Sequence, residues 1–225
     1  MACMNMTLIH YIDLQIRNTL RFLLGSLFDF CPTTDSVPHD SMQVIDQYLL
    51  HQLHEFNIQV TEAYKNFDYS RVSRLMLALL NRELSSFYFS IVKDRLYCDD
   101  PRGKKRRSCQ TALNIGLDMV CGALAPILPH LAEEVCLHRS SSEHLSVFHS
   151  GWIDPPESWK KLGVLEAVEA ACSVRNTFLK AIGGQNPVEY DVTLVIDPSL
   201  LLELLEVRFA HFHTSSMMLT LPSFY

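Results

Sequence analysis

The segment LAPILPHLAEEV, residues 124–135, holds the residue types best suited to acid–base chemistry. His130 and the adjacent carboxylates Glu133 and Glu134 are types that transfer protons in enzymes. Pro129, however, is typical of the first position of a helix, where its missing N–H costs nothing. Adjacent helical residues point about 100° apart, so the two glutamates do not form a paired acid–base site. We therefore expect a structural helix from Pro129, with both glutamates in its first turns, and no catalytic residue.

Metal-ligating residues are present, but their spacing does not indicate a metal site. His211 and His213 are two residues apart, which would suit a strand or loop site, yet no Cys, Asp or Glu lies near them at ligand spacing. The seven cysteines include no CxxC pair, which predicts thiols in a reducing compartment rather than a disulfide framework or zinc ribbon. We expect no metal and no cofactor in this chain, and a free-standing hydrolase is the weakest hypothesis.

Basic residues on a long predicted helix, 69–96, point to phosphate binding instead. On a wheel of 100° per residue, Arg71, Arg82 and Lys93 fall within about 40° of one another. Such a stripe is compatible with the net charge of −6, and it would bind phosphates in a salt-sensitive way. The alternative is a solvated face paired with local carboxylates such as Glu83. The apolar residues expected opposite the stripe are Met76, Leu80, Leu84, Phe87 and Ile91.

Apolar spacing along the chain predicts a mainly α protein. The composition, 48% hydrophobic and 20% charged, is that of a globular domain. Ser41 is the expected N-cap of the second helix, and 190–197 is the only convincing strand. No apolar run reaches the length of a membrane span, and the N-terminus does not resemble a signal or transit peptide. The expected helices are 12–28, 41–66, 69–96, 108–124, one from Pro129, 163–181 and 199–209.

These elements predict a helical bundle followed by a small α/β appendage that reads as truncated, because a lone strand cannot form a stable sheet. Residues 99–107 are expected to be a charged loop, and 163–181 to bury an apolar set that includes Val164 and Leu165. The expected organisation is a divergent segment 1–15, the bundle 16–140, a linker 141–162, the partial appendage 163–210 and a divergent tail 211–225.

Five blocks of the sequence occur in a characteristic order: IRNTLRFLLGSLFDF (16–30), NRELSSFYFSIVKDRLYCDD (81–100), RRSCQTAL (106–113), LAPILPHLAEEV (124–135) and GW (151–152). Together they resemble the anticodon-binding helical domain of class I isoleucyl-tRNA synthetases, and the mitochondrial type in particular. The resemblance covers residues 15 to about 208. The block FYFSIVKDRLYCD favours the isoleucyl branch over its leucyl, valyl and methionyl relatives.

The resemblance implies part of an isoleucine–tRNA ligase, which charges tRNA(Ile) with isoleucine using ATP and Mg. The HIGH-like and KMSKS-like motifs of the family do not occur here, nor does its editing domain. Whether the chain is an enzyme is therefore uncertain, and it is not expected to be active alone. Expected partners are tRNA(Ile) and the missing catalytic core, with no membrane and no DNA. The compartment implied is the mitochondrial matrix, or the cytoplasm if the chain exists as written.

The resemblance also implies tRNA-binding residues, because anticodon bases are recognised by stacking and by cationic donors. Trp152 would be a stacking platform, or alternatively a packing anchor between bundle and appendage. Two other functions stay open: a helical module that binds a protein, and an inactive fragment derived from the ligase. The implied tRNA-binding residues are Arg17, Asn18, Arg21, Arg82, Lys93, Arg95, Arg106, Arg107 and Trp152.

Overall fold

The computed structural model describes residues 2–139, 146–181, 183, 193–194 and 219–220. The chain divides into two compact units, Met1–Lys161 and Leu162–Tyr225. The expected helix 199–209 and the histidine pair His211 and His213 lie outside the described residues. The predicted fold class, a mainly α protein with a helical bundle, is confirmed.

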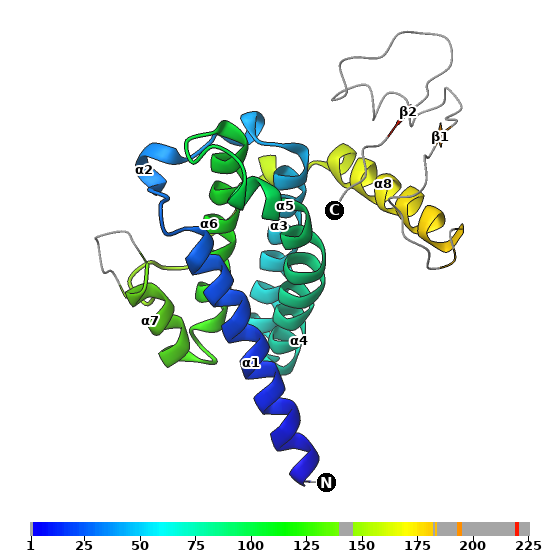
Figure 1. The fold of residues 1–225 in the computed structure, drawn as a ribbon. Coiled ribbons are helices and arrows are strands. Elements are labelled where there is room, and N and C mark those ends of the chain that lie inside the picture. The colour runs from blue at the N-terminus through cyan, green and yellow to red at the C-terminus, as the bar shows by residue number, and fades with distance from the viewer. Residues whose placement is uncertain (1, 140–145, 182, 184–192, 195–218, 221–225) are drawn as a thin grey trace. The chain divides into compact units, whose positions relative to one another are not determined.

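The first unit is a bundle whose centre is the parallel pair α3 and α6, with the other long helices packed around it (Figure 1). Leu50 and Leu53 of α3 and Leu113 and Leu117 of α6 are all fully or almost fully buried. The elements of this unit are α1 (Ala2–Ser26), α2 (Pro32–Asp35), η1 (His39–Ser41), α3 (Val44–Lys65), α4 (Tyr69–Ala78), η2 (Leu79–Tyr88), α5 (Phe89–Tyr97), α6 (Lys104–Leu124), α7 (Pro129–Leu137) and η3 (Glu157–Trp159).

Three helix starts differ from those predicted. α1 begins ten residues before position 12. α3 follows Gln43 as N-cap, without a side-chain cap, because Ser41 belongs to the preceding 3₁₀ turn. α6 begins at Lys104, inside the expected charged loop, with Gly103 as N-cap. Four basic residues therefore lie in the first turn of α6 rather than in a loop, which changes what they can contact.

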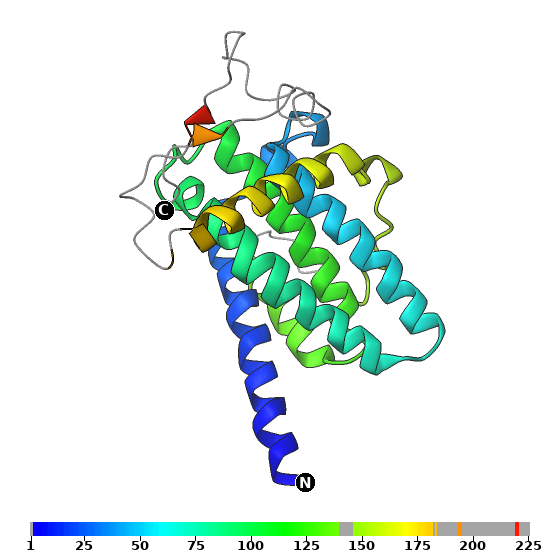
Figure 2. The same ribbon diagram turned by 90° about the vertical axis from the view of Figure 1, so that its right-hand side faces the viewer.

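One continuous rod, α4–η2–α5, supplies the predicted long helix (Figure 2). Its middle part, η2, is a π-helix, in which Phe89 N–H donates to Leu84 O five residues earlier. By length and composition alone this rod would also pass for a membrane-spanning helix. One side of it is buried in the bundle. The buried residues of that side are Val72, Met76, Leu80, Leu84, Tyr88, Val92 and Leu96.

This buried row repeats every four residues, which an α-helix cannot sustain. At 3.6 residues per turn, a stride of four drifts about 40° around the axis at each step. A π turn holds more residues and so removes the drift. The predicted apolar face was therefore partly wrong, because the wheel assumed α geometry throughout. Phe87 is only partly buried, and Ile91 is exposed.

The second unit contains α8 (Leu162–Ala181) and two short strands. β1 (Thr193–Leu194) pairs antiparallel with β2 (Leu219–Thr220), so part of the predicted strand 190–197 is a strand, and its other residues lie outside the described ones. Among its described residues, α8 has none that is buried. The expected buried set with Val164 and Leu165 is therefore wrong, and both are partly exposed.

Candidate nucleic-acid interface

The side of the rod opposite the buried row is an exposed ridge. Because the π segment removes the drift of a four-residue stride around the axis, exposed residues on this side also recur every four positions. Arg74 and Arg82 lie on this ridge, and Lys93 is exposed beside its far end. The side chain of Arg82 is 78% exposed, and its Nε donates to Glu83 Oε1 at 2.6 Å. The ridge consists of Ser70, Arg74, Ala78, Arg82, Ser86, Ser90 and Asp94.

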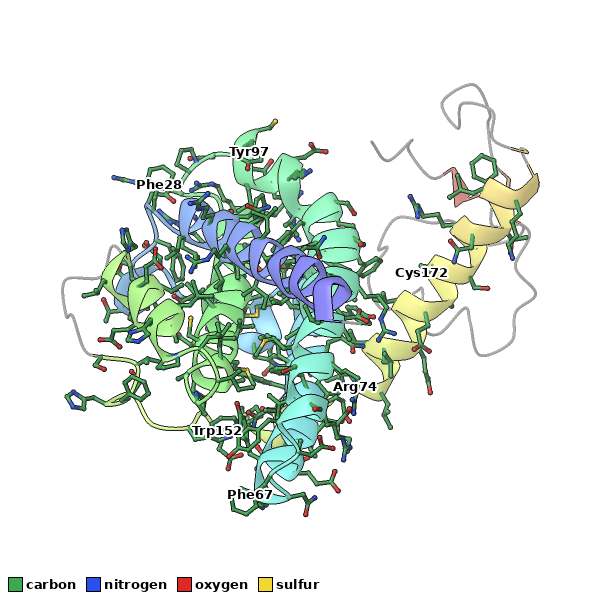
Figure 3. All side chains as sticks on the ribbon, turned by 90° about the horizontal axis from the view of Figure 1, so that it is seen from below. Phe28, Phe67, Arg74, Tyr97, Trp152 and Cys172 are labelled. Carbon is green, nitrogen blue, oxygen red and sulfur yellow. The ribbon has the colours of Figure 1, made fainter. Side chains whose placement is uncertain are left out.

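The ridge differs from the predicted stripe at its N-terminal end. Arg71, expected on the stripe, is partly buried, and its Nη2 lies 3.4 Å from Glu62 Oε2. Arg74, which the wheel did not single out, is exposed on the ridge (Figure 3). The stride-four apolar row in the sequence was the signal that could have identified Arg74.

Arg95, also predicted to bind tRNA, is held inside the bundle by Asp46. Asp46 Oδ1 accepts from Arg95 Nη2 at 2.8 Å and from Tyr88 Oη at 2.7 Å. Asp46 Oδ2 accepts from Arg95 Nη1 at 3.0 Å and from Ser108 Oγ at 2.5 Å. We call these four residues, Asp46, Tyr88, Arg95 and Ser108, the Asp46 hub. It joins α3, η2, α5 and α6 through one carboxylate with no solvent exposure.

The Asp46 hub shifts the pKa values of both Arg95 and Tyr88. Burial alone would lower the pKa of Arg95, but the hydrogen bonds and charge of Asp46 outweigh it and raise that pKa. Burial, followed by the charge of Asp46, raises the pKa of Tyr88 well above its ordinary value. Tyr88 is therefore a protonated donor and Arg95 a cation at neutral pH. The Arg95 side chain is 14% exposed, so its donors face the hub.

Arg106 and Arg107 are engaged in a second internal cluster, around Asp29. Arg106 Nη1 and Nη2 donate to the two Asp29 oxygens at 2.5 and 3.1 Å, and Gln110 Nε2 donates to Oδ1 at 2.8 Å. Arg107 Nη1 donates to the Asp29 carbonyl at 2.9 Å and lies 3.4 Å from Asp35 Oδ2. We call Asp29, Arg106, Arg107 and Gln110 the Asp29 cluster. It ties the start of α6 to the chain just after α1.

Burial alone would raise the pKa of Asp29, but the hydrogen bonds from Arg106 and Gln110, with the charges of Arg106 and Arg107, hold it below 3.8. The prediction that Arg95, Arg106 and Arg107 contact tRNA stays a prediction. Their donors, however, already have internal carboxylate partners in the described part of the chain.

The predicted residues of α1 lie on a different helix from the ridge. Arg17 Nη1 donates to Glu134 Oε2 at 3.2 Å across to α7, while both side chains keep substantial exposure. Asn18 and Arg21 are exposed. Arg17 therefore helps to dock α7, whereas Asn18 and Arg21 present polar groups to solvent.

Trp152 packs against α3 within the first unit and stays 43% exposed. Its ring lies edge-on to Tyr64, with centroids 5.9 Å apart, and Tyr64 is also edge-on to Tyr69 at 6.0 Å. Tyr64 Oη donates to Ala123 O at 2.6 Å, and burial raises its pKa to about 12. Trp152 thus anchors its segment to α3. Figure 3 places it and Phe67 at the edge of the bundle opposite Phe28 and Tyr97.

The two candidate acid–base carboxylates, Glu133 and Glu134, have structural roles. Pro129 is the first residue of α7, as expected, and Glu133 and Glu134 lie in its second turn. Glu133 Oε2 accepts from Ser146 Oγ at 3.0 Å and Val147 N at 3.1 Å. Glu134 accepts from Arg17, and His130 is exposed. The two carboxylates therefore bind different elements and share no site.

Comparison with known proteins matches residues 46–186 to the anticodon-binding domain of tRNA ligases. The helical bundle and this match define the class, and the chain belongs to the family of tRNA ligase anticodon-binding domains. Within it, the similarity is to the isoleucine ligases, and the relatives found include mitochondrial ones.

The chain is 53% identical over 195 residues to the mitochondrial isoleucine–tRNA ligase of Gallus gallus, covering 85% of this chain and 19% of that protein. It is 56% identical over 194 residues to that of Mus musculus, covering 86% and 19%. The isoleucine–tRNA ligase of Thermosynechococcus vestitus is 45% identical over 147 residues, covering 65% and 15%. The chain therefore spans about a fifth of the length of the mitochondrial relatives it matches.

Proposed function

We propose that this chain binds tRNA(Ile) as the anticodon-recognition part of an isoleucine–tRNA ligase. The observation that carries the proposal is the match of residues 46–186 to a tRNA ligase anticodon-binding domain. The names of the similar mitochondrial ligases support isoleucine as the amino acid.

The exposed cations are the proposed contacts to RNA. Arg74, Arg82 and Lys93 on the rod would bind backbone phosphates, which need cationic donors that are open to solvent. Arg21 and Asn18 on α1 would add further donors. Each phosphate contact releases counterions, so binding is expected to weaken steeply as salt rises.

The remaining predicted residues have other roles in this proposal. The half-exposed Trp152 would offer a face for base stacking, which is how proteins hold splayed single-stranded bases. Arg95, Arg106 and Arg107 would act indirectly, by fixing the helices that carry the contacts. Arg17 would do both, since it is paired with Glu134 and still partly exposed.

We also propose a second partner and a cellular compartment for this chain. In a longer ligase, a catalytic domain outside this chain would use ATP and Mg to charge the tRNA, and it would be the second partner of the bundle. The mitochondrial relatives make the mitochondrial matrix the proposed compartment.

The test is binding of the purified chain to mitochondrial tRNA(Ile) and to an unrelated tRNA across a salt series. We expect selective binding whose logarithmic salt slope falls by about 0.9 for each lost contact to duplex phosphates. Arg82→Glu and Lys93→Glu should both weaken binding. Lys180→Glu, an exposed reversal on α8, is the matched control.

Equal affinity for the two tRNAs would refute recognition of tRNA(Ile) by this chain. Equal losses from Arg82→Glu and Lys180→Glu would refute the ridge as the binding surface, since only net charge would then matter.

A further inference from the structure

The π-helix in the rod requires a cause, because its geometry is rare in proteins and it runs here over Leu79–Tyr88. Ser86 Oγ donates to Asn81 O at 2.7 Å, which satisfies one carbonyl inside the widened turns. That bond is local, and a single hydrogen bond contributes only modestly to stability. The interactions that select this geometry must therefore come from the groups against which the rod packs.

The two ends of the π segment are anchored in different parts of the bundle. Met76, just before η2, is buried among apolar residues. Tyr88, its last residue, donates to Asp46. Twelve residues separate them, and at 100° per residue an α-helix would turn Tyr88 about 120° away from the face of Met76. Only a rod with wider turns places Met76 in the core and Tyr88 on Asp46 at once.

Arg95 reinforces the same register. It lies seven residues after Tyr88, which is about two α-helical turns, so α5 presents both side chains to one side. Asp46 accepts three hydrogen bonds from this pair and a fourth from Ser108. An α-helical rod would leave the buried Asp46 carboxylate without these partners, and an unpaired buried charge is strongly unfavourable.

We propose that Asp46 is a positioning residue that selects the π-helical register of Leu79–Tyr88 through Tyr88 and Arg95. This register places Arg74 and Arg82 on one exposed ridge, with Lys93 at its end. In an α-helical rod, Lys93 would rotate around the axis relative to Arg74. The hub thus sets the spacing of cations offered to RNA, a consequence that rests on the proposed function.

The experiment must distinguish a change in the helical geometry of the rod from a change in the stability of the whole bundle. A variant with Asp46→Leu, Tyr88→Phe and Arg95→Met replaces the buried charges and the phenol by apolar groups of similar size, a change that often preserves stability. Deleting the exposed Ser86 is the matched rescue. It places the tyrosine eleven positions after Met76, about 20° from three full α-helical turns, so the anchors align without a π segment.

Hydrogen exchange of the rod amides, with α3 amides as an internal reference, gives the readout. In the triple variant we expect exchange over residues 79–92 to be about tenfold faster while α3 is unchanged. In the background lacking Ser86, the same three substitutions should have no effect on the rod. If the triple variant does not fold, Tyr88→Phe alone should speed rod exchange about threefold.

Unchanged rod protection in the triple variant would overturn the inference. So would equal acceleration in rod and α3, which would mark the hub as a general stabiliser, and so would a loss that persists without Ser86. Binding of tRNA(Ile) is then measured on the same variants. If the wild-type chain does not bind, the proposed function fails, while hydrogen exchange still decides the register.

Discussion

Two groups of arginines in this chain look alike in sequence and differ in structure. Arg74 and Arg82 lie on the exposed ridge, whereas Arg95, Arg106 and Arg107 point at Asp46 and Asp29. Arg82 and Arg95 both have a carboxylate partner, so it is the exposure of the side chain, 78% for Arg82 and 14% for Arg95, that decides which arginine is open to a phosphate. A basic sequence pattern therefore overstates the binding surface unless its internal partners are identified first.

The strongest test of this difference is Arg95→Ala. It leaves the fully buried Asp46 without its cation, and breaking such a pair costs about 3–5 kcal/mol. Urea unfolding should show this loss. A loss below 1 kcal/mol, on the order of a surface pair, would put Arg95 with the ridge residues instead.

Arg106→Ala should have the next largest effect. It removes two hydrogen bonds to Asp29 and one each to the Leu96 and Pro101 carbonyls, at an expected cost of about 2–3 kcal/mol. The exposed neighbour Arg102 is the control, because Arg102→Ala should change stability by less than about 0.5 kcal/mol. Thermal unfolding of both variants measures the difference, and equal values would contradict the assignment.

The Asp29 cluster also predicts a pH dependence. Because the folded-state pKa of Asp29 lies below 3.8, its contribution is present above that value and is lost as pH falls through the folded pKa. Wild type should therefore lose more stability than Asp29→Asn between about pH 6 and about pH 3. Urea unfolding at the two pH values measures this. A steeper loss in the variant would reverse the sign and refute the argument.

Arg82→Ala should have the smallest effect on folding. Its side chain is 78% exposed, so the free energy of unfolding should change by less than about 0.5 kcal/mol. Binding to tRNA(Ile) should nevertheless weaken, by about three- to tenfold at low salt. Titration of labelled tRNA, beside a melting curve of the same preparation, checks both halves. Destabilisation as large as that of Arg95→Ala would erase the contrast between ridge and interior.

Sequence alone placed the helices well because their apolar spacing is local information. α3, α7, α8 and the rod lie close to their predicted positions. The π segment was not predicted, because the helical wheel assumed 100° per residue throughout. Val72, Met76 and Leu80 nevertheless begin a visible four-residue spacing of apolar residues.

The ion pairs could not be predicted in the same way. Asp46 and Arg95 are 49 residues apart, and Asp29 and Arg106 are 77 apart, so no local pattern links them. The start of α6 could not be predicted either, because four consecutive basic residues at a helix N-terminus interact unfavourably with the helix dipole. Arg106 and Arg107 are tolerated there because Asp29 neutralises them.

The Asp46 hub also bears on the order of folding. Its donors come from residues 88, 95 and 108, so its full set of four hydrogen bonds is present only after α3, the rod and α6 have all docked. Contacts completed that late are largely absent from the folding transition state. Substitutions at the hub should then accelerate unfolding and leave the folding rate nearly unchanged. The hub would act as a kinetic latch that determines how long the assembled bundle persists.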